Sequence, residues 1–470
     1  QAAQMSRKKG RIILVGVIGL NINRADFYEK ELTFQISCSY GPGRYDEQYE
    51  HKGIDYPLPY VRWTEKRNFE AILNTIRDKN LKLKDLISEK VLLKNYSHVY
   101  NNMESSNSIA SIIEYPSLST ENLKFRTITL KDMFFDGQKG VFGIIGAGNF
   151  TNMTILPSLK GCGAKIKTIA SSGGTSGTQL AKKYDISQST TDYKKILNDN
   201  NIDTVIITTR HNTHSKLVIE SLKKGKNTFV EKPLALNQEE SEQIIKTFNS
   251  TQLNTKSQNL KSNNPTLTVG FNRRFSPHLI KVKQSINGSV GPVNIIANMN
   301  AGFIPTNHWV HDLEQGGGRI LGEACHLIDV CVYLSSSLVK SVCMNTLGIE
   351  TIENTDNASI MLKFQNGSNA VINYFSNGSK KYSKERVEIY SQERTWIVDN
   401  YRKTEAFGVR GFKTLKTKLD KGHENQFLEF VRRVKESGKP LISIKEIINV
   451  TKASFAAINS MKTNQWVDVD

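Results

Sequence analysis

A strand–helix alternation in the middle of the chain constrains its fold more than any other feature. Helix-patterned segments separate apolar runs with the length of buried strands, at residues 141–145, 166–170, 204–208, 227–230 and 266–271. Consecutive strands joined by helices run parallel, because each right-handed crossover lays its helix on a face of the sheet. The pattern predicts an α/β domain with a doubly wound parallel sheet over residues 139–271, in which the polar stretch 249–264 is a surface loop.

The rest of the chain follows two other patterns. After residue 272, strand-like runs dominate, with one helix at 320–334 and two long helices near the end, at 424–435 and 444–461. This arrangement predicts a second, α+β domain over 272–470, built on a largely antiparallel open sheet. The first 130 residues predict a partial α/β segment, with strands at 11–17 and 32–39, a helix at 68–77, and a Ser/Asn-rich linker at 101–127.

A glycine turn follows the first strand of the central domain. Gly146 permits a tight turn, and Gly148 lets the backbone approach a pyrophosphate closely. The helix that opens there offers free N–H groups and a positive dipole end, with Asn149 and Phe150 at its start. The usual fingerprint continues with Gly or Ala, whereas this chain has Thr151, and glycine-rich turns also occur for other reasons. The strand before the turn and the helix after it favour a Rossmann dinucleotide-binding domain.

The end of the second strand bears on the choice of cofactor. An Asp or Glu about 20 residues after the turn binds the adenosine ribose hydroxyls and disfavours the 2′-phosphate of NADP. Residues 168–174 contain no acid, and Ser171 and Ser172 can donate hydrogen bonds to a phosphate. The sequence therefore leans toward NADP. Both NAD and NADP stay open, since the Arg expected for NADP is also missing.

Several motifs in a fixed order resemble the Gfo/Idh/MocA oxidoreductase family over about residues 140–470. They are Gly146-Ala-Gly-Asn149, Thr208-Thr-Arg-His-Asn-Thr-His214, Glu231-Lys-Pro233 and Gly316-Gly-Gly-Arg-Ile-Leu-Gly-Glu-Ala-Cys-His326. The resemblance implies a dehydrogenase or reductase that uses NAD or NADP on a sugar, a cyclitol or a nucleotide-sugar. It also implies a homo-oligomer that associates through the open face of the second-domain sheet.

The resemblance assigns roles to individual residues. Oxidation of a secondary alcohol needs a base near the hydroxyl, and His326 is expected to fill that role because the histidine pKa of about 6.5 suits it. Lys232 is expected to orient the hydroxyl or stabilise alkoxide charge. Glu231 is expected at the nicotinamide ribose, and Thr209, Arg210 and His214 in the cofactor cleft. Alternatively, His326 is a buried structural imidazole and Lys232 a solvated loop lysine.

One departure from the family lies beside the expected base. Many family members carry Asp four residues before the catalytic His, and here Gly322 stands at that position with Glu323 next to it. Glu323 is a candidate to replace that carboxylate in part, although a helix turns about 100° per residue. Arg273, Arg274 and Trp309 are further substrate-side candidates. The alternative for the two arginines is a surface salt bridge.

The front of the chain resembles a different enzyme. Gly10-Arg-Ile-Ile-Leu-Val-Gly16, Tyr40-Gly-Pro-Gly-Arg-Tyr45 and Tyr60-Val-Arg-Trp-Thr-Glu65 are similar to the C-terminal end of a zinc-type medium-chain alcohol dehydrogenase module. In bi-domain oxidoreductases such a module precedes a Gfo/Idh/MocA unit, in bacterial surface-polysaccharide gene clusters. Residues 1–130 lack the zinc ligands and the dinucleotide loop of that module. They are expected to be a remnant without catalysis of its own.

Composition limits the other classes of function. A net charge of +18 invites a nucleic-acid interpretation, but the lysines are scattered and often paired with acids. The protein is therefore not expected to bind nucleic acid. Five irregularly spaced cysteines indicate reduced cytoplasmic thiols and no metal site. No apolar run is long enough to cross a membrane. The alternative to an enzyme is a regulatory or structural protein that holds the cofactor without turnover.

Overall fold

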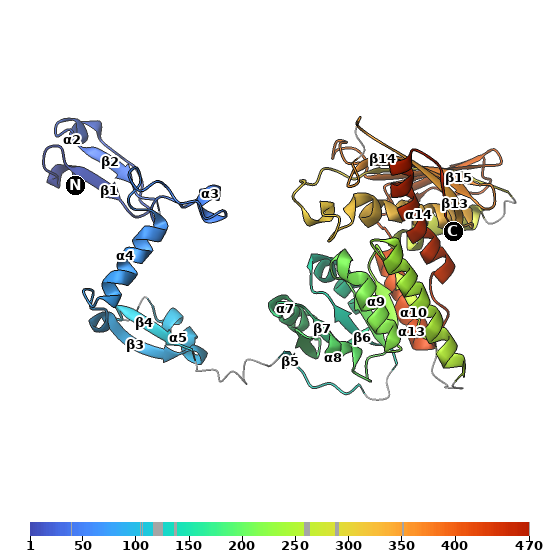
Figure 1. Cartoon of the computed structure of the whole chain (residues 1–470), viewed down its shortest axis with the longest axis horizontal. Helices are drawn as coiled ribbons and strands as arrows, with labels where there is room; N and C mark the ends of the chain where they lie inside the picture. The colour runs from blue at the N-terminus through green and yellow to red at the C-terminus, as the bar shows by residue number, and fades with distance from the viewer. Residues whose placement is uncertain are drawn as a thin grey trace. The chain divides into compact units, whose positions relative to one another are not determined.

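The computed structural model has two compact units, Gln1–Leu123 and Lys124–Asp470 (Figure 1). The structure describes residues 1–38, 40–103, 105, 107–115, 126–135, 139–257, 264–286, 291–349 and 352–469. The predicted linker at 101–127 lies partly outside these residues, as does the end of the predicted loop at 249–264.

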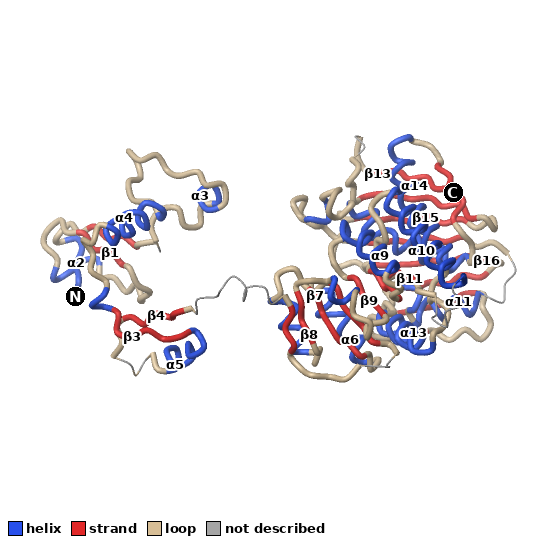
Figure 2. The backbone as a smooth tube through the Cα atoms, turned by 60° about the horizontal axis from the view of Figure 1, so that its bottom comes forward, coloured by secondary structure: helices blue, strands red, loops and turns tan. Residues whose placement is uncertain are grey.

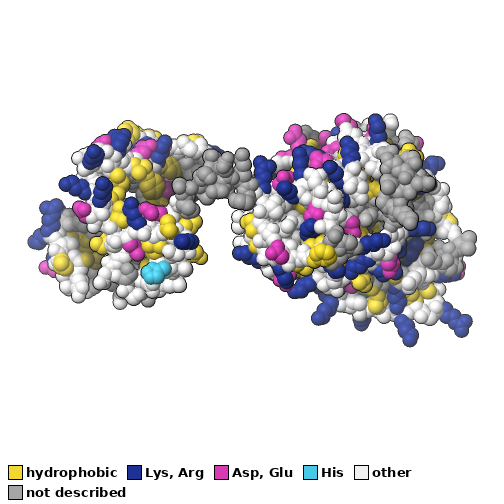
Figure 3. All heavy atoms as spheres, turned by 90° about the horizontal axis from the view of Figure 1, so that it is seen from below, with side chains coloured by type: hydrophobic (Ala, Val, Ile, Leu, Met, Phe, Trp, Pro, Cys, Tyr) yellow, Lys and Arg dark blue, Asp and Glu magenta, His cyan; other side chains and the backbone are white. Residues whose placement is uncertain are grey.

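The N-terminal unit contains two small sheets. Each described sheet is a parallel pair, β1 (Arg11–Leu14) with β2 (Thr33–Ile36), and β3 (Ile87–Leu92) with β4 (Ala110–Glu114). Its helices are α1 (Ala2–Met5), α2 (Arg24–Tyr28), α3 (Glu47–Glu50), α4 (Glu65–Arg77) and α5 (Tyr96–Asn101). Of the apolar side chains described in this unit, Ala3 alone is buried, and Figure 3 shows apolar side chains on its surface.

Both predicted N-terminal strands are longer than the observed ones. β1 ends at Leu14, and Val15 and Val17 beyond it are 81% and 106% exposed. The paired register runs only from Arg11↔Thr33 to Leu14↔Ile36, so the apolar residues after Leu14 have no neighbouring strand to continue the ladder. The apolar pattern extends further than the pairing does.

The second unit begins with the predicted doubly wound sheet, which is confirmed. Seven strands of the described chain lie in the order β11-β10-β9-β6-β7-β8-β5, parallel throughout except for the edge strand β5. Figure 2 shows β7, β8, β9 and β11 of this sheet with helices beside them. The strands are β5 (Thr127–Thr129), β6 (Val141–Ile145), β7 (Lys165–Ala170), β8 (Gln188–Thr190), β9 (Thr204–Ile207), β10 (Asn227–Val230) and β11 (Leu267–Val269). All five residues of β6 are buried, as a strand covered on both faces requires.

Helices from distant parts of the chain cover this sheet. They are α6 (Leu156–Gly161), α7 (Thr175–Lys183), α8 (Lys194–Leu197), α9 (His214–Lys223), α10 (Gln238–Ser257) and α13 (His423–Glu436). From near the C-terminus, α13 brings Phe427 and Phe430 against Phe229, with ring centroids 5.0 and 5.3 Å apart. This packing attaches α13, from the C-terminal part of the chain, to the seven-stranded sheet.

The predicted surface loop at 249–264 is wrong over its first part, because α10 continues to Ser257. Ile244 is buried and Phe248 packs against the same core, so an apolar face anchors the helix before the polar residues begin. Polar residues of modest helix propensity extend a helix that is already nucleated. The Thr251 hydroxyl also donates to the Phe248 carbonyl at 2.7 Å, within the helix.

The predicted mainly antiparallel domain is also confirmed. Within the described residues, nine strands lie in the order β19-β18-β17-β16-β12-β15-β14-β13-β20, with β12 and β15 as a parallel pair. They are β12 (Asn294–Asn300), β13 (Val339–Thr346), β14 (Asn357–Phe364), β15 (Asn369–Phe375), β16 (Glu385–Ser391), β17 (Arg394–Asp399), β18 (Lys403–Phe407), β19 (Leu415–Lys416) and β20 (Val467–Asp468). Burial alternates along β14 and β15, so one face meets the core. The helices of this domain are α11 (Pro277–Ile286), α12 (Cys325–Ser335) and α14 (Ile444–Thr463).

The order of the parallel strands fixes where a site can form. From β6 the chain builds outward through β7 and β8, then returns to place β9 on the other side of β6. This reversal is a topological switch point, where the two loops after neighbouring strands part and leave a crevice at the carboxyl ends. The loops that begin at Gly146 and Thr208 flank this point.

Candidate active site

The glycine turn after β6 has the geometry of a phosphate-binding loop. Gly146 has φ of 118°, and a Cβ there would lie 2.6 Å from the Thr208 hydroxyl oxygen and 2.7 Å from the Thr208 carbonyl carbon. Only a residue without a side chain lets the two loops meet this closely. At Gly148 a Cβ would meet nothing within 4 Å, so the backbone is open to a ligand. The turn therefore fits a diphosphate.

Thr151 fills the position where the fingerprint has a small residue. Its side chain is buried, and its hydroxyl lies 3.1 Å from the Gly146 carbonyl oxygen and 2.7 Å from the Thr208 hydroxyl oxygen. The helix passes this point as a π-helical turn, Thr151–Ile155, before α6 begins. The hydroxyl is thus fully paired, and the departure from the fingerprint leaves the open side of the turn unobstructed.

The other predicted cofactor residues after β6 and β7 lie at the same edge of the sheet. Asn149 and Phe150 are exposed, and the Phe150 ring lies 6.0 Å from the His423 ring. Ser172 is exposed, whereas the Ser171 hydroxyl accepts a hydrogen bond of 3.1 Å from the Gly177 N–H. The Ser171 hydroxyl keeps its own hydrogen available to donate.

The loop after β9 holds the predicted residues Thr209, Arg210 and His214. The Thr209 and Thr213 hydroxyls are 2.6 Å apart, and Arg210 donates to Gln315 at 2.6 Å and stacks over the Trp309 ring. His214 is buried between two carbonyl oxygens, with Nδ1 2.8 Å from Pro233 and Nε2 3.1 Å from Thr209. His214 thereby braces this loop against the loop that carries Lys232.

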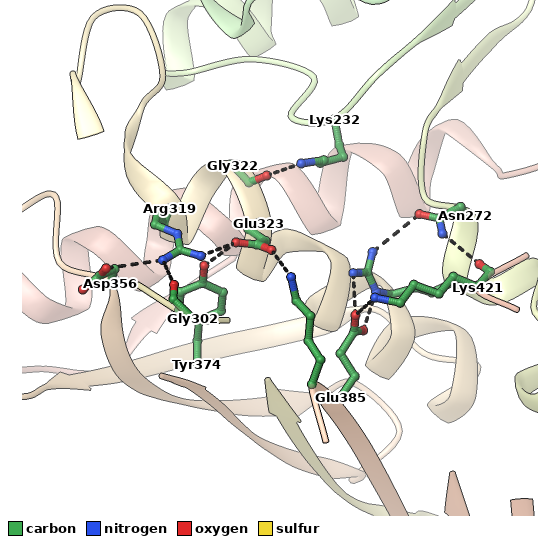
Figure 4. Close-up of polar contacts among 12 residues, drawn as sticks. Lys232, Asn272, Gly302, Arg319, Gly322, Glu323, Asp356, Tyr374, Glu385 and Lys421 are labelled. Atoms are coloured by element: carbon green, nitrogen blue, oxygen red, sulfur yellow. Dashed lines mark hydrogen bonds and ion pairs between the residues drawn. The ribbon is translucent and has the colours of Figure 1, made fainter. Parts of the chain in front are cut away.

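The loop after β10 places the side chain of Lys232 beside the start of the buried helix α12. The Lys232 ammonium donates to the Gly322 carbonyl at 2.6 Å (Figure 4), and the Lys232–Pro233 peptide bond is cis. Burial raises the pKa of Glu231 to about 7, although Lys232 next to it acts in the opposite direction. The Glu231 carboxylate also packs on Gly270, where a Cβ would lie 2.6 Å from Oε1.

His326, the predicted base, lies at the second residue of α12 and is 6% exposed. Its Nδ1 atom is buried without a hydrogen-bond partner in the described part of the chain. Burial lowers its pKa well below the ordinary value, and the nearby charges of Arg273 and Lys232 lower it further. The imidazole is therefore neutral near pH 7 and keeps a lone pair to accept a proton.

The predicted substrate residues Arg273 and Arg274 form buried ion pairs. Arg273 makes a bidentate contact with Glu385, at 2.6 and 3.0 Å, and Lys421 joins the same carboxylate at 2.5 Å. Arg274 pairs with Asp329, and its Nη1 atom lies 2.6 Å from Oε2 of Glu446. Salt bridges are thus present, but in the interior and not at the surface. Substrate contact by either arginine stays a prediction.

Glu323 belongs to a second polar cluster beneath Lys232 (Figure 4). Its carboxylate accepts hydrogen bonds from Arg319 at 2.9 Å and from the Tyr374 hydroxyl at 2.5 Å. Burial alone raises its pKa, but the charge of Lys384, the hydrogen bond from the Tyr374 hydroxyl and two further cations hold the pKa at about 2. Glu323 is thus a permanent carboxylate whose hydrogen bonds fix it to the sheet.

Two groups near the site were missed from the sequence. His211 donates from Nδ1 to the Gly316 carbonyl at 2.7 Å, and its ring lies 4.9 Å from that of Trp309. His423, at the first turn of α13, lies close enough to His326 to lower its pKa, as does Lys421. A signal existed for both, since His211 and His214 share one motif and His423 follows a glycine before a strong helix pattern.

Two kinds of feature are absent from the described residues. They contain no cluster of three or more His, Cys, Asp or Glu side chains able to hold a metal ion. They also contain no helix long and apolar enough to cross a membrane.

Comparison with protein families agrees with this geometry. The family model of the oxidoreductase family with an NAD-binding Rossmann fold matches residues 141–256, and the model of the GFO/IDH/MocA C-terminal domain matches residues 280–397. The chain from residue 141 onward is therefore an oxidoreductase with an NAD-binding domain. Residues 141–256 and 280–397 therefore carry the two domains of a Gfo/Idh/MocA family oxidoreductase.

Individual relatives cover the same part of the chain. Myo-inositol 2-dehydrogenase of Thermotoga maritima is 25% identical over 307 residues, 62% of this chain and 87% of the relative. The NAD(+)-dependent scyllo-inositol 2-dehydrogenase of Bacillus subtilis is 25% identical over 346 residues, 70% of this chain and 95% of the relative. The structure of levoglucosan dehydrogenase with NADH and levoglucosan aligns with a TM-score of 0.60 at 21% identity, covering 71% of this chain and 100% of that one.

Proposed function

We propose that the second unit is an NAD(P)-dependent dehydrogenase or reductase that acts on a CH–OH group of a sugar, cyclitol or nucleotide-sugar. One observation carries the proposal: the Lys232 ammonium is hydrogen-bonded to the backbone one helical turn before His326, at the edge of the sheet where the open Gly148 turn lies. The named substrates of the relatives, inositols and levoglucosan, support the polyol class.

The residues of the chain divide the work of alcohol oxidation. The bound nicotinamide supplies the acceptor for the hydride. His326, neutral because of its burial, accepts the hydroxyl proton. Lys232 places its side-chain nitrogen beside the reacting oxygen and stabilises the negative charge that develops there. Gly146 and Gly148 hold the diphosphate at the helix start, and Glu231, Thr209, Arg210 and His214 line the cofactor cleft. Trp309 and Glu323 line the substrate side.

We further propose that the protein prefers NADP to NAD. Ser171 and Ser172 stand at the end of β7, where residues 168–174 include no acid to repel a 2′-phosphate. In the opposite direction, one relative is named for NAD(+) and another structure holds NADH. Titration of the protein with NADH and with NADPH distinguishes the two preferences. If the serines bind the 2′-phosphate, we expect tighter binding of NADPH than of NADH.

We also propose roles for the domains and for the N-terminal unit. Residues 1–130 are proposed to be a medium-chain dehydrogenase remnant, residues 139–271 the cofactor domain and 272–470 the substrate and oligomerisation domain. The two-stranded β1–β2 sheet, with its exposed apolar residues, fits a remnant. A role in surface-polysaccharide synthesis and a homo-oligomer are proposed from the same resemblance. Lys and Arg are interleaved with Asp and Glu on the face in Figure 3, which does not favour nucleic acid.

Turnover by the purified full chain tests the proposal. The protein is mixed with NAD⁺ or NADP⁺ and with myo-inositol, scyllo-inositol, levoglucosan or UDP-sugars, and reduced cofactor is followed at 340 nm. We expect reduction of the cofactor with at least one polyol. Tight cofactor binding without turnover on a broad panel would support the alternative of a cofactor-holding protein, and absence of cofactor binding would overturn both.

A further inference from the structure

The side chain of His211 occupies the space next to the backbone of Gly322. A Cβ built at Gly322 would lie 3.0 Å from Cε1 of His211 and 3.5 Å from its Nδ1. Any side chain at position 322 would extend further along the same direction and reach the imidazole. Position 322 and position 211 therefore share one space, which His211 fills.

Several contacts fix the orientation of the His211 ring. Its Nδ1 lies 2.7 Å from the Gly316 carbonyl oxygen, and the ring meets Trp309 edge to face at 72°. Neighbouring contacts hold the loop, since Arg210 donates to Gln315 and the Asn212 N–H donates to the Gln315 carbonyl at 3.2 Å. The ring is thus held on both sides by the second domain.

The same contacts determine which nitrogen is free. A carbonyl oxygen only accepts, so Nδ1 carries the hydrogen and Nε2 keeps its lone pair. Burial, followed by the charge of Lys232, lowers the pKa of His211 to about 3, which leaves the ring neutral. Nε2 makes no hydrogen bond within the described residues and is not among the fully buried atoms that lack a partner. It is an accessible acceptor.

His211 lies on the same side of the long buried helix as the proposed base. Gly322 lies in the π-helical turn Ile320–Ala324, which leads directly into α12, and it precedes His326 by four residues, about one turn. Lys232 donates to the Gly322 carbonyl and lowers the pKa of both imidazoles. Both neutral imidazoles therefore lie near the same side-chain nitrogen.

We propose that His211 is a substrate-binding residue whose Nε2 accepts a hydrogen bond from the hydroxyl on the carbon next to the one that is oxidised. The proposal rests on the proposed function and deepens it, because it assigns the enzyme to substrates with a vicinal diol. It also explains Gly322: a side chain there would displace the ring that makes this contact.

The first arm of the test uses unfolding temperatures and needs no substrate. Gly322→Ala, His211→Ala and the double variant are compared with the wild type by thermal unfolding. We expect Gly322→Ala to lower the Tm of the wild type and to have little effect in the His211→Ala background, because the contact is then absent. Equal Tm shifts in both backgrounds would refute the shared space. Asn212→Ala, an exposed neighbour, is the control and should leave Tm unchanged.

The second arm separates binding from packing. His211→Asn keeps an N–H donor for the Gly316 carbonyl but has no acceptor at the position of Nε2. With an inositol and its deoxy analogue lacking the adjacent hydroxyl as probes, we expect this variant to stay folded, with a Tm at least as high as that of His211→Ala, and to raise KM for the inositol about tenfold, while its KM for the deoxy analogue is unchanged. An unchanged KM for the inositol would overturn the proposal. An inactive wild type would instead overturn the proposed function, while the Tm arm would still decide the packing.

Discussion

The two units of the chain contain similar apolar strands with opposite fates. In the second unit, every residue of β6 is buried between helices. In the N-terminal unit, Val15 and Val17, just after the end of β1, are exposed to solvent. The local pattern is alike, but burial requires neighbouring strands and covering helices, which the two-stranded β1–β2 sheet lacks. An apolar run thus specifies a strand only where the rest of a layer completes it.

The same difference decides where chemistry is possible. The second unit has a switch point between β6 and β9, and its loops bring a phosphate turn, Lys232 and His326 to one edge. The described sheets of the N-terminal unit are single strand pairs without such a reversal. We therefore expect variants in the second unit to change function and stability strongly, and matched variants in the first to have little effect.

The largest expected effect is on turnover. His326→Ala should lower kcat about 10³-fold, because the proposed base that takes the hydroxyl proton is lost. Affinity for the reduced cofactor, measured by fluorescence titration, should stay within about twofold. His98→Ala in the N-terminal unit is the matched control. Comparable rates for His326→Ala and the wild type would remove this residue from the mechanism.

Stability offers the next contrast between the units. Phe427→Ala should lower the free energy of unfolding by about 3–5 kcal/mol, because the ring is fully buried against the parallel sheet. Phe69→Ala in α4, where the ring is 50% exposed, should cost less than about 1 kcal/mol. Chemical denaturation followed by circular dichroism measures both. Similar losses would mean that the N-terminal unit has a core as tight as that of the second.

A smaller effect concerns pH and Glu231. Burial raises its pKa to about 7, so the folded state binds its proton more tightly than the unfolded state does. The stabilising contribution is full below the ordinary pKa of 4.5 and is lost as the pH rises through about 7. Glu231→Gln lacks this loss, so its Tm relative to the wild type should rise between pH 5 and pH 8. A pH-independent Tm difference would contradict the raised pKa.

The smallest effect is expected from removal of the whole first unit. A protein comprising residues 124–470 should keep cofactor affinity and turnover within about twofold of the full chain, because the proposed site residues all lie in the second unit. Cofactor titration and steady-state kinetics of the two proteins provide the comparison. A large loss of turnover in the shortened protein would show that the N-terminal unit contributes to the site.

The sequence predicts what local pattern determines. The bounds of β6 and β10 match the apolar runs at 141–145 and 227–230, because both strands are covered on both faces. The edge strand β5 and the partly exposed strand β13 have no such continuous run, and they were not predicted. Their strand structure depends on pairing with β8 and with β14, which the local apolar pattern does not show.

Site contacts divide in the same way. The Gly146 turn and the Lys232 and His326 motifs can be recognised locally, whereas the partners of their neighbours cannot. Arg273 pairs with Glu385, 112 residues further along the chain. The contact of His211 with Gly322 depends on two loops that meet only in the folded domain. Sequence alone therefore leaves open which charged groups are free for a ligand.

A crystal structure of the protein with NADH and a polyol substrate would show whether the cofactor and the two proposed catalytic side chains meet. We expect the diphosphate at the Gly148 backbone and the reacting carbon of the polyol between the nicotinamide and the side chains of Lys232 and His326, at about 3–3.5 Å. A nicotinamide bound far from both side chains, or a diphosphate bound elsewhere than at the 146–148 turn, would contradict it.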